Sequence, residues 1–147
     1  MLGYYLVERR EYWDIPLAGK PVCRFKVDMH LILEFFEPED EETRVEIAGE
    51  FRLLVNNGEY KLSAQERTGL GPVLHLYRKT VEWARAFKDG RLEMKFFDDG
   101  QLTVFPTTEF ESWQVIGARG LRVVCTPSGQ LFTWQAEPPD SSEGGVH

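Results

Sequence analysis

The stretch Lys95–Phe105 reads KFFDDGQLTVF and decides how the surrounding chain folds. Two phenylalanines stand side by side, although a strand with one wet face should alternate apolar and polar residues. A three-residue loop at Asp98–Gly100 resolves this, because it pairs Phe96 with Leu102 and keeps the inner face apolar. The glycine then takes the left-handed position of a bulged hairpin. Phe97 is left on the outer face, where we expect another element to cover it.

Asparagine-glycine and aspartate-glycine pairs predict further hairpins, because these residues suit the left-handed backbone of a type I′ turn. A two-residue turn at Asn57–Gly58 pairs Val55 with Tyr60 and leaves the apolar residues on one face. Gly120 and Gly129 mark two more turns in the last third of the chain. The repeated plan of strand, glycine turn and strand predicts an antiparallel β protein.

The turn at Asp89–Gly90 has a less favourable consequence. Counted as a two-residue turn, it pairs Phe87 with Leu92 and carries Arg85 to the inner face, opposite Met94. A guanidinium group on a buried face costs free energy unless it is paired. Arg85 could lie at the edge of the sheet, be re-aimed by a bulge or serve a site, and we expect the edge.

These signals together predict a mainly β protein, α+β at most, whose hairpins form a meander, an open roll or a sandwich. Short helical turns are expected within Leu62–Arg78, which glycine and proline interrupt, and within Pro106–Trp113, which carries a capping-box pattern. The 147 residues, 42% of them hydrophobic, suffice for one core. We predict a single domain over residues 1–135 and a disordered acidic tail over residues 136–147.

The net charge of −7 argues against nucleic acid as a partner, because such a surface repels phosphate groups. No apolar run approaches the roughly 20 residues of a membrane span, so no membrane partner is expected. Cys23 and Cys125 stand far apart in apolar runs and are predicted to be buried thiols. The first residues lack the basic start and apolar region of a signal peptide. A cytoplasmic location is therefore predicted.

Three polar residues share one face of the predicted strand VDMHLILEFF: Asp28, His30 and Glu34. One imidazole and two carboxylates could begin a metal site or an acid–base pair, so these residues are the catalytic candidates. The alternative is the ordinary solvated face of an antiparallel sheet, which the sequence favours because no second histidine stands nearby. Nucleophile, phosphate-loop and zinc motifs are missing, so the sequence predicts no cofactor and no metal and leans away from an enzyme.

An acidic run between two predicted strands is a candidate binding surface. It reads EPEDEE, and its candidate residues are Glu37, Glu39, Asp40, Glu41 and Glu42. Like charges and a proline disfavour strand pairing there, which predicts a solvated loop. Such a loop could steer the chain toward a basic partner protein, and Phe97 is the apolar candidate for the same role.

Several motifs in order resemble a small bacterial family, domain of unknown function 6188. They are IPLAGKPVCRF, LILEFFE, LYRKTVEWARAFKDGRLEMKFFDDGQLTV, EFESWQVIG and GLRVVCTPSGQLFTW. In the family's Tyr-Glu-x-Trp element, the tyrosine is replaced by Phe110 here, whereas Glu111 and Trp113 match. The closing turn has Ser128 where the family usually has glycine. The resemblance spans Ile15–Trp134 and brings no established activity with it.

Three functions remain open from the sequence. The first is a non-catalytic protein-binding module, in its sharper form an immunity-type inhibitor of a basic toxin. The second is a small-ligand or metal-binding protein or an enzyme that uses the face of Asp28, His30 and Glu34. The third is a self-associating structural domain whose exposed strand edge pairs with a copy of itself. The missing catalytic set favours the first.

Overall fold

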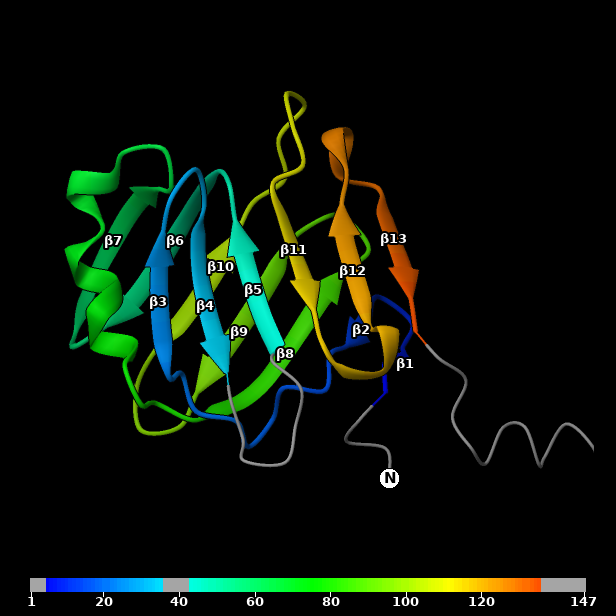
Figure 1. The fold of residues 1–147 in the computed structure, drawn as a ribbon, viewed down its shortest axis with the longest axis horizontal. Coiled ribbons are helices and arrows are strands. Elements are labelled where there is room, and N and C mark those ends of the chain that lie inside the picture. The colour runs from blue at the N-terminus through cyan, green and yellow to red at the C-terminus, as the bar shows by residue number, and fades with distance from the viewer. Residues whose placement is uncertain (1–4, 36–42, 136–147) are drawn as a thin grey trace, which may run out of the picture.

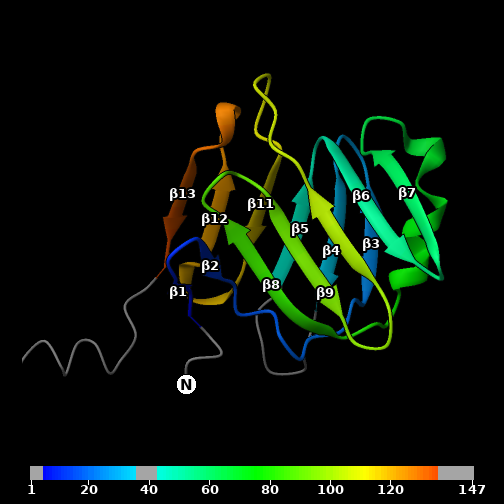
Figure 2. The same ribbon diagram turned by 180° about the vertical axis from the view of Figure 1, so that it is seen from behind.

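The computed structural model describes residues 5–35 and 43–135, which form two antiparallel sheets that face each other (Figure 1, Figure 2). The seven-stranded sheet contains, in spatial order, β1 (Val7–Glu8), β2 (Tyr12–Asp14), β8 (Val81–Phe87), β9 (Leu92–Phe96), β10 (Gln101–Val104), β6 (Glu50–Val55) and β7 (Gly58–Ser63). The six-stranded sheet contains β13 (Leu131–Trp134), β12 (Arg122–Cys125), β11 (Trp113–Ile116), β5 (Thr43–Ile47), β4 (Leu31–Phe35) and β3 (Arg24–Val27).

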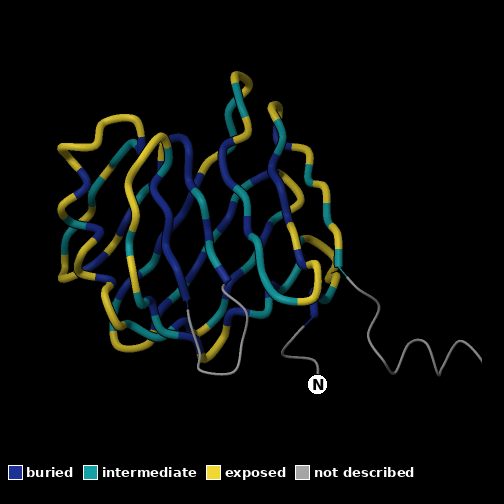
Figure 3. Tube along the Cα trace, viewed as in Figure 1, coloured by how far each residue is buried: buried dark blue, intermediate teal, exposed yellow. Residues whose placement is uncertain are grey.

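The core lies between the sheets, as the dark blue segments of facing strands show (Figure 3). Alternate residues of each strand reach it, because successive side chains of a strand point to opposite faces. On β9 the inward residues are Leu92, Met94 and Phe96, and on β4 they include Leu33 and Phe35. Each such side chain contributes about 1.5–3 kcal/mol of burial free energy. The mainly β prediction is confirmed, and the architecture is that of a sandwich.

The chain passes back and forth between the sheets in blocks of hairpins. Strands β3 to β5 and β11 to β13 belong to the six-stranded sheet, and the others belong to the seven-stranded sheet. The crossings that follow β5 and β10 meet at one end of the sandwich, where the Ala48 amide donates to the Ser112 carbonyl at 2.8 Å. This end of the molecule therefore gathers segments that are distant in sequence.

Helical structure is limited to short 3₁₀ turns in the described residues. They are η2 (Arg67–Gly69), η3 (Gly71–Leu76), η4 (Ala118–Gly120) and η5 (Pro127–Gly129). The first two confirm the turns predicted after β7, and η3 buries Val73 and Leu76 against the core. No helix within residues 5–35 and 43–135 is long and apolar enough to cross a membrane.

The helical turn predicted within Pro106–Trp113 is wrong. The segment before β11 has no helix, because its polar backbone groups find partners elsewhere. The Thr107 carbonyl accepts the Ser128 amide at 3.0 Å, and the Thr107 hydroxyl accepts the Glu109 amide at 3.3 Å. Contacts with η5 thus replace the internal bonds that a helix would need.

The β9–β10 hairpin has the predicted faces but a register shifted by two residues. Leu102 pairs with Met94, and the Phe96 amide donates to the Gly100 carbonyl at 3.0 Å. The loop therefore consists of residues 97–99. Gly100, with φ 129°, follows the loop and lies opposite Phe96. A Cβ on that glycine would lie 3.3–3.5 Å from Leu76 and Phe96, so the missing side chain makes this register possible.

The expectation that another element covers Phe97 is also wrong. Its side chain is 49% exposed in the loop, while its amide donates to the Thr80 carbonyl at 2.9 Å.

The β6–β7 hairpin also shifts by two residues. Val55 pairs with Gly58 and Leu53 with Tyr60, so the turn consists of Asn56 and Asn57. Both asparagines have positive φ, 52° and 62°, as a type I′ turn requires. Asparagine tolerates this region, which frees the glycine to begin β7. A shift of two residues keeps every side chain on its predicted face.

The register of the β8–β9 hairpin differs from the prediction by one residue. The side chains of β8 therefore lie on the face opposite to the predicted one. The Phe87 amide donates to the Arg91 carbonyl, so the loop has three residues and Gly90 at φ 104° closes it. Ala84 then faces Met94 in the core, and Arg85 points outward opposite Glu93. The predicted inward arginine is therefore wrong, because small alanines fill the space opposite the large β9 side chains.

Two other predictions have mixed outcomes. Cys125 is buried as predicted, but Cys23 is only half-buried, with its Sγ 3.5 Å from the Pro21 carbonyl. The acidic run Glu37–Glu42 and the tail 136–147 lie outside the described residues.

Candidate functional site

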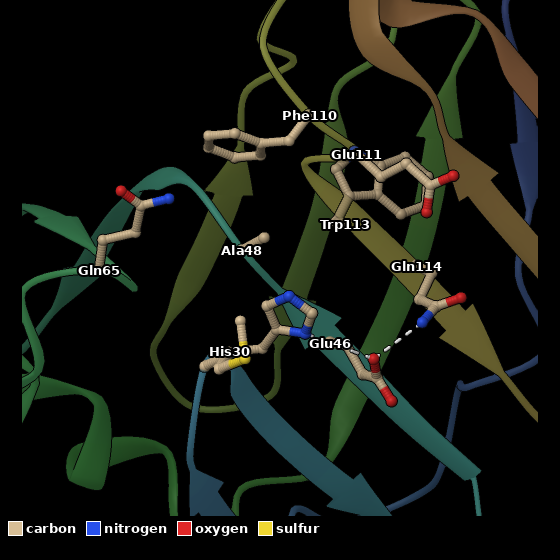
Figure 4. Close-up of a pocket in the computed structure, with 9 residues that line it drawn as sticks. His30, Glu46, Ala48, Gln65, Phe110, Glu111, Trp113 and Gln114 are labelled. Atoms are coloured by element: carbon tan, nitrogen blue, oxygen red, sulfur yellow. Dashed lines mark hydrogen bonds and ion pairs between the residues drawn. The ribbon is translucent and has the colours of Figure 1, made fainter.

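A cleft of about 380 Å³ opens at the end of the sandwich where the chain crosses between the sheets (Figure 4). Four separate segments build it: the β3–β4 turn, the end of β5, the loop after β7 and the segment that leads into β11. Its polar side chains are His30, Glu46, Gln65, Glu111 and Gln114, and its apolar ones are Met29, Ala48, Phe110 and Trp113. We call it the His30 cleft.

One wall of the cleft is an imidazole held beside a carboxylate. His30 Nδ1 lies 3.7 Å from Glu46 Oε1, and the same oxygen accepts a hydrogen bond from Gln114 Nε2 at 2.8 Å. Arg44 Nε donates to the other carboxylate oxygen at 2.7 Å. Figure 4 shows the second ring nitrogen of His30 pointing away from Glu46, toward Ala48. The carboxylate thus lies beside one ring nitrogen, and the other nitrogen is left for a ligand.

The Glu46 carboxyl is ionised in the folded protein at neutral pH. Burial raises its pKa, but the hydrogen bonds from Arg44 and Gln114 lower it more, so the pKa lies below its ordinary 4.5. The Arg44 and His30 charges act in the same direction. Bonds to the charged form therefore outweigh the cost of removing it from water.

This pKa predicts a loss of stability in acid. Because the folded pKa is below the unfolded one, the stabilisation is complete above about pH 4.5 and is lost as the pH falls through the folded pKa. Glu46→Gln has no carboxyl to titrate there, so its free energy of unfolding should fall less steeply. Urea unfolding between about pH 5 and pH 3 measures both slopes. Equal slopes in the two proteins would contradict the prediction.

The opposite wall is aromatic and rests on close packing. A Cβ added to Gly49 would lie 3.3 Å from the Phe110 ring, so that ring sits directly against the β5–β6 backbone. Trp113 forms the buried floor, and its indole Nε1 donates to the Gly90 carbonyl at 2.9 Å. Met29 stands at the mouth with 77% of its surface exposed. The cleft therefore combines an apolar wall with hydrogen-bonding groups.

The structure separates the three residues that the sequence placed on one strand face. Asp28 lies in the β3–β4 turn, where it accepts the His30 amide at 2.8 Å. This bond lowers the pKa of its carboxyl. Glu34 is buried on β4, four residues after His30, which corresponds to about 13 Å along an extended strand. Its two oxygens lie 2.7 Å from Arg24 Nε and 3.1 Å from Lys26 Nζ.

Among residues 5–35 and 43–135, no three His, Cys, Asp or Glu side chains are grouped so that they could hold a metal ion. Cys125 is buried, and burial raises the pKa of its thiol, which disfavours the nucleophilic thiolate.

Sequence reasoning missed the groups that actually surround His30. Glu46 and Gln114 are neighbours only because β5 and β11 pair, with Glu46 opposite Gln114 in the register. Phe110 and Gln65 reach the cleft from two unrelated loops. Nothing in the sequence pairs the strand of Glu46 with β11.

Of the candidate binding residues, the structure describes Phe97. Glu37, Glu39, Asp40, Glu41 and Glu42 lie outside the described residues. Phe97 lies in the β9–β10 loop, at the opposite end of the sandwich (Figure 1).

A second feature shares the outer face of the six-stranded sheet with the cleft. Phe132 and Trp134 of β13 are 45% and 51% exposed, and their rings stack with centres 6.3 Å apart and a 26° tilt. The Arg122 guanidinium lies 5.5 Å from the Trp134 ring centre, and its Nε donates to Gln114 at 3.2 Å. We call Arg122, Phe132 and Trp134 the aromatic edge. Gln114 joins it to the cleft.

The outer face between these features is open. In Figure 1 it is turned toward the viewer, and no described element lies in front of it. Its cations on β3 and β5 are paired on the face itself, Arg24 and Lys26 with Glu34 and Arg44 with Glu46. The face therefore has a cleft at one end and stacked aromatic rings at its edge.

Comparison with known proteins identifies a family but no activity. No curated protein and no solved structure matches this chain. The model of a family of unknown function, DUF6188, matches residues 13–135, which include β3 to β13, all but the first residue of β2, and every residue of the cleft and of the aromatic edge. The resemblance noted in the sequence is thus confirmed, and the chain belongs to the DUF6188 family of unknown function.

Proposed function

We propose that this chain is a non-catalytic protein-binding module that binds a basic partner protein on the outer face of its six-stranded sheet. The observation that carries the proposal is the aromatic edge, in which Phe132 and Trp134 are stacked and half-exposed beside Arg122. Tryptophan and arginine dominate the binding energy of protein interfaces. Large apolar side chains that stay exposed together usually mark such a surface.

The aromatic edge is also held in place before any partner arrives. Trp134 contacts both the Phe132 ring and the Arg122 guanidinium, and Arg122 is itself bound to Gln114. Fixed side chains lose little conformational entropy on binding, so more of the contact energy appears as affinity. This supports the edge as the anchor of the interface.

The charge of the chain supports a basic partner. The net charge is −7, and the cations of the outer face on β3 and β5 are already paired with carboxylates. Attraction at long range therefore favours a positive protein, with fast association that salt weakens. The sharper form of the proposal is an immunity-type inhibitor that neutralises a basic toxin domain in the cytoplasm.

The non-catalytic part of the proposal depends on what surrounds His30. The imidazole and Glu46 form an acid–base pair, yet the other cleft side chains are amides, a carboxylate and apolar groups. Among the described residues, no hydroxyl, thiol or amine nucleophile lines the cleft beside this pair. The lining supplies hydrogen bonds and shape, which suits recognition.

Substituting the aromatic edge tests the proposal. Tagged wild-type protein is expected to capture one stoichiometric basic protein from a native lysate, and Trp134→Ala should bind that protein about 30-fold more weakly, a loss of about 2 kcal/mol. Isothermal titration with the purified partner measures the change.

Phe97→Ala is the matched control, since Phe97, the apolar candidate from the sequence, is a similarly exposed aromatic residue, 49%, in the β9–β10 loop of the other sheet, away from the proposed interface. It should bind like wild type. Capture of no protein, capture of an acidic protein, or equal affinity for wild type and Trp134→Ala would each refute the proposal. Denaturation curves confirm that both variants fold, because exposed substitutions usually change stability by about 0.5 kcal/mol or less.

A further inference from the structure

We infer that the His30 cleft binds the guanidinium group of an arginine side chain. This deepens the proposed function, because it names the group that the basic partner would insert, and it rests on that function only for the identity of the partner. The cleft volume of about 380 Å³ falls at the lower end of the range of about 300–1,000 Å³ for small-ligand sites.

The charge of the lining selects a cation. Two carboxylates, Glu46 and Glu111, line the cleft, and no lysine or arginine does. Arg44 pairs with Glu46 from outside the lining, whereas Glu111 makes no ion pair within the described part of the chain. Glu46 is ionised at neutral pH because its pKa is lowered. A ligand that enters therefore meets an unneutralised carboxylate at Glu111 and an ionised one below it.

The shape of the lining selects a flat cation on an apolar stem. Phe110 presents an aromatic ring whose position is fixed by close contact with Gly49, and Met29 is exposed at the mouth. A guanidinium group stacks on an aromatic face, whereas an ammonium group is a compact and strongly hydrated charge. The methylene groups of arginine would pack against the same apolar wall.

The polar groups of the cleft match the donors of a guanidinium. Arginine carries five N–H donors and no acceptor. The Glu111 carboxylate and the Gln65 amide oxygen are acceptors that line the cleft. Gln114 is already bound to Glu46 and Arg122, so it fixes the wall and is not needed by the ligand.

Titration with N-acetyl-arginine amide tests the inference without any partner. The full chain is labelled with ¹⁵N and with ¹³C at its methionine methyl groups, and chemical shifts are followed by NMR. We expect saturable shifts at Met29, His30 and Phe110. N-acetyl-citrulline amide has the same shape without the charge and should bind at least tenfold more weakly. Equal binding of the two ligands, or no saturable shift with arginine up to its solubility limit, would overturn the inference.

Two variants show whether the shifts come from the cleft. Glu111→Gln and Phe110→Ala should each weaken arginine amide binding at least fivefold. Glu109→Gln is the matched control, because it removes an exposed carboxylate two residues away that does not line the cleft. A loss with Glu109→Gln equal to that with Glu111→Gln would indicate general charge attraction and reject the site.

The same experiment separates this inference from the proposed function. Trp134→Ala leaves the cleft intact and should bind arginine amide like wild type, although it should lose the partner protein. Arginine amide binding without capture of a partner would refute the proposed function alone. Partner capture that depends on Trp134 but not on Glu111 would refute the arginine site alone.

Discussion

Gly90→Ala is expected to lower the free energy of unfolding by about 3 kcal/mol or more, enough to leave a marginally stable domain largely unfolded. Two costs add. Gly90 has φ 104°, a region that residues with a Cβ rarely adopt. The new Cβ would also lie 2.8 Å from the Gly129 Cα and 2.9 Å from its carbonyl oxygen. Because both atoms belong to the backbone, neither can rotate away, and the β8–β9 and β12–β13 loops must separate.

Two other glycines divide this effect into its parts. Gly19 has φ 87° with open space around the position of its Cβ, so Gly19→Ala measures the backbone cost alone, about 1–2 kcal/mol. Gly69 has open space and no positive φ, so Gly69→Ala should be neutral or stabilising by about 0.4–1 kcal/mol. Urea unfolding of the three variants gives the comparison. A loss for Gly90→Ala no larger than that for Gly19→Ala would disprove the contact between the loops.

Trp113→Ala is expected to cost about 3–5 kcal/mol of stability. The side chain is 1% exposed, belongs to the core and donates its indole proton to the Gly90 carbonyl at 2.9 Å. It therefore joins β11 of the six-stranded sheet to the β8–β9 loop of the seven-stranded sheet. Its loss opens a cavity between the sheets and removes the partner of that carbonyl.

Trp113→Phe separates these two roles. It keeps an aromatic ring in the core but leaves the Gly90 carbonyl without its donor, so the cost should be about 1–3 kcal/mol. Trp134→Phe is the control at an exposed tryptophan and should cost about 0.5 kcal/mol or less. Guanidinium unfolding followed by far-UV circular dichroism measures all three variants. A cost for Trp113→Ala below 1 kcal/mol would show that the indole does not bridge the sheets.

The contact between the loops of Gly90 and Gly129 could not be predicted from the sequence. Asp89–Gly90 and Ser128–Gly129 are both recognisable as turns from the sequence, but their contact depends on how two sheets stack. The same holds for the cleft. His30 was a candidate from its strand face, while Glu46, Gln114 and Phe110 join it through strand pairing and two crossings. Of the predicted companions, Asp28 accepts the His30 amide within the β3–β4 turn, whereas the extended strand β4 carries Glu34 away from the cleft.

In the hairpins, the alternation of side chains was predictable from the sequence, but the register of each strand pair was not. The sequence placed Leu92, Met94 and Phe96 on the buried face, and the structure agrees, because alternation along a strand is a local property. It put Arg85 on the wrong face, because a three-residue loop at Gly90 moved the register by one. A register shift of one residue moves every side chain of a strand to the opposite face of the sheet, whereas the two-residue shifts at Asn57 and Gly100 leave each side chain on its predicted face.

By itself, the sequence determined that this chain forms antiparallel strands with glycine and asparagine turns, and which face of most strands is apolar. These properties follow from backbone sterics and from the two-residue period of a strand, which act between near neighbours. Only the tertiary structure decided the registers, the stacking of the two sheets and the assembly of the His30 cleft and the aromatic edge. Those depend on packing between segments far apart in the chain, where side-chain volume and backbone approach select one arrangement among several that the local pattern allows.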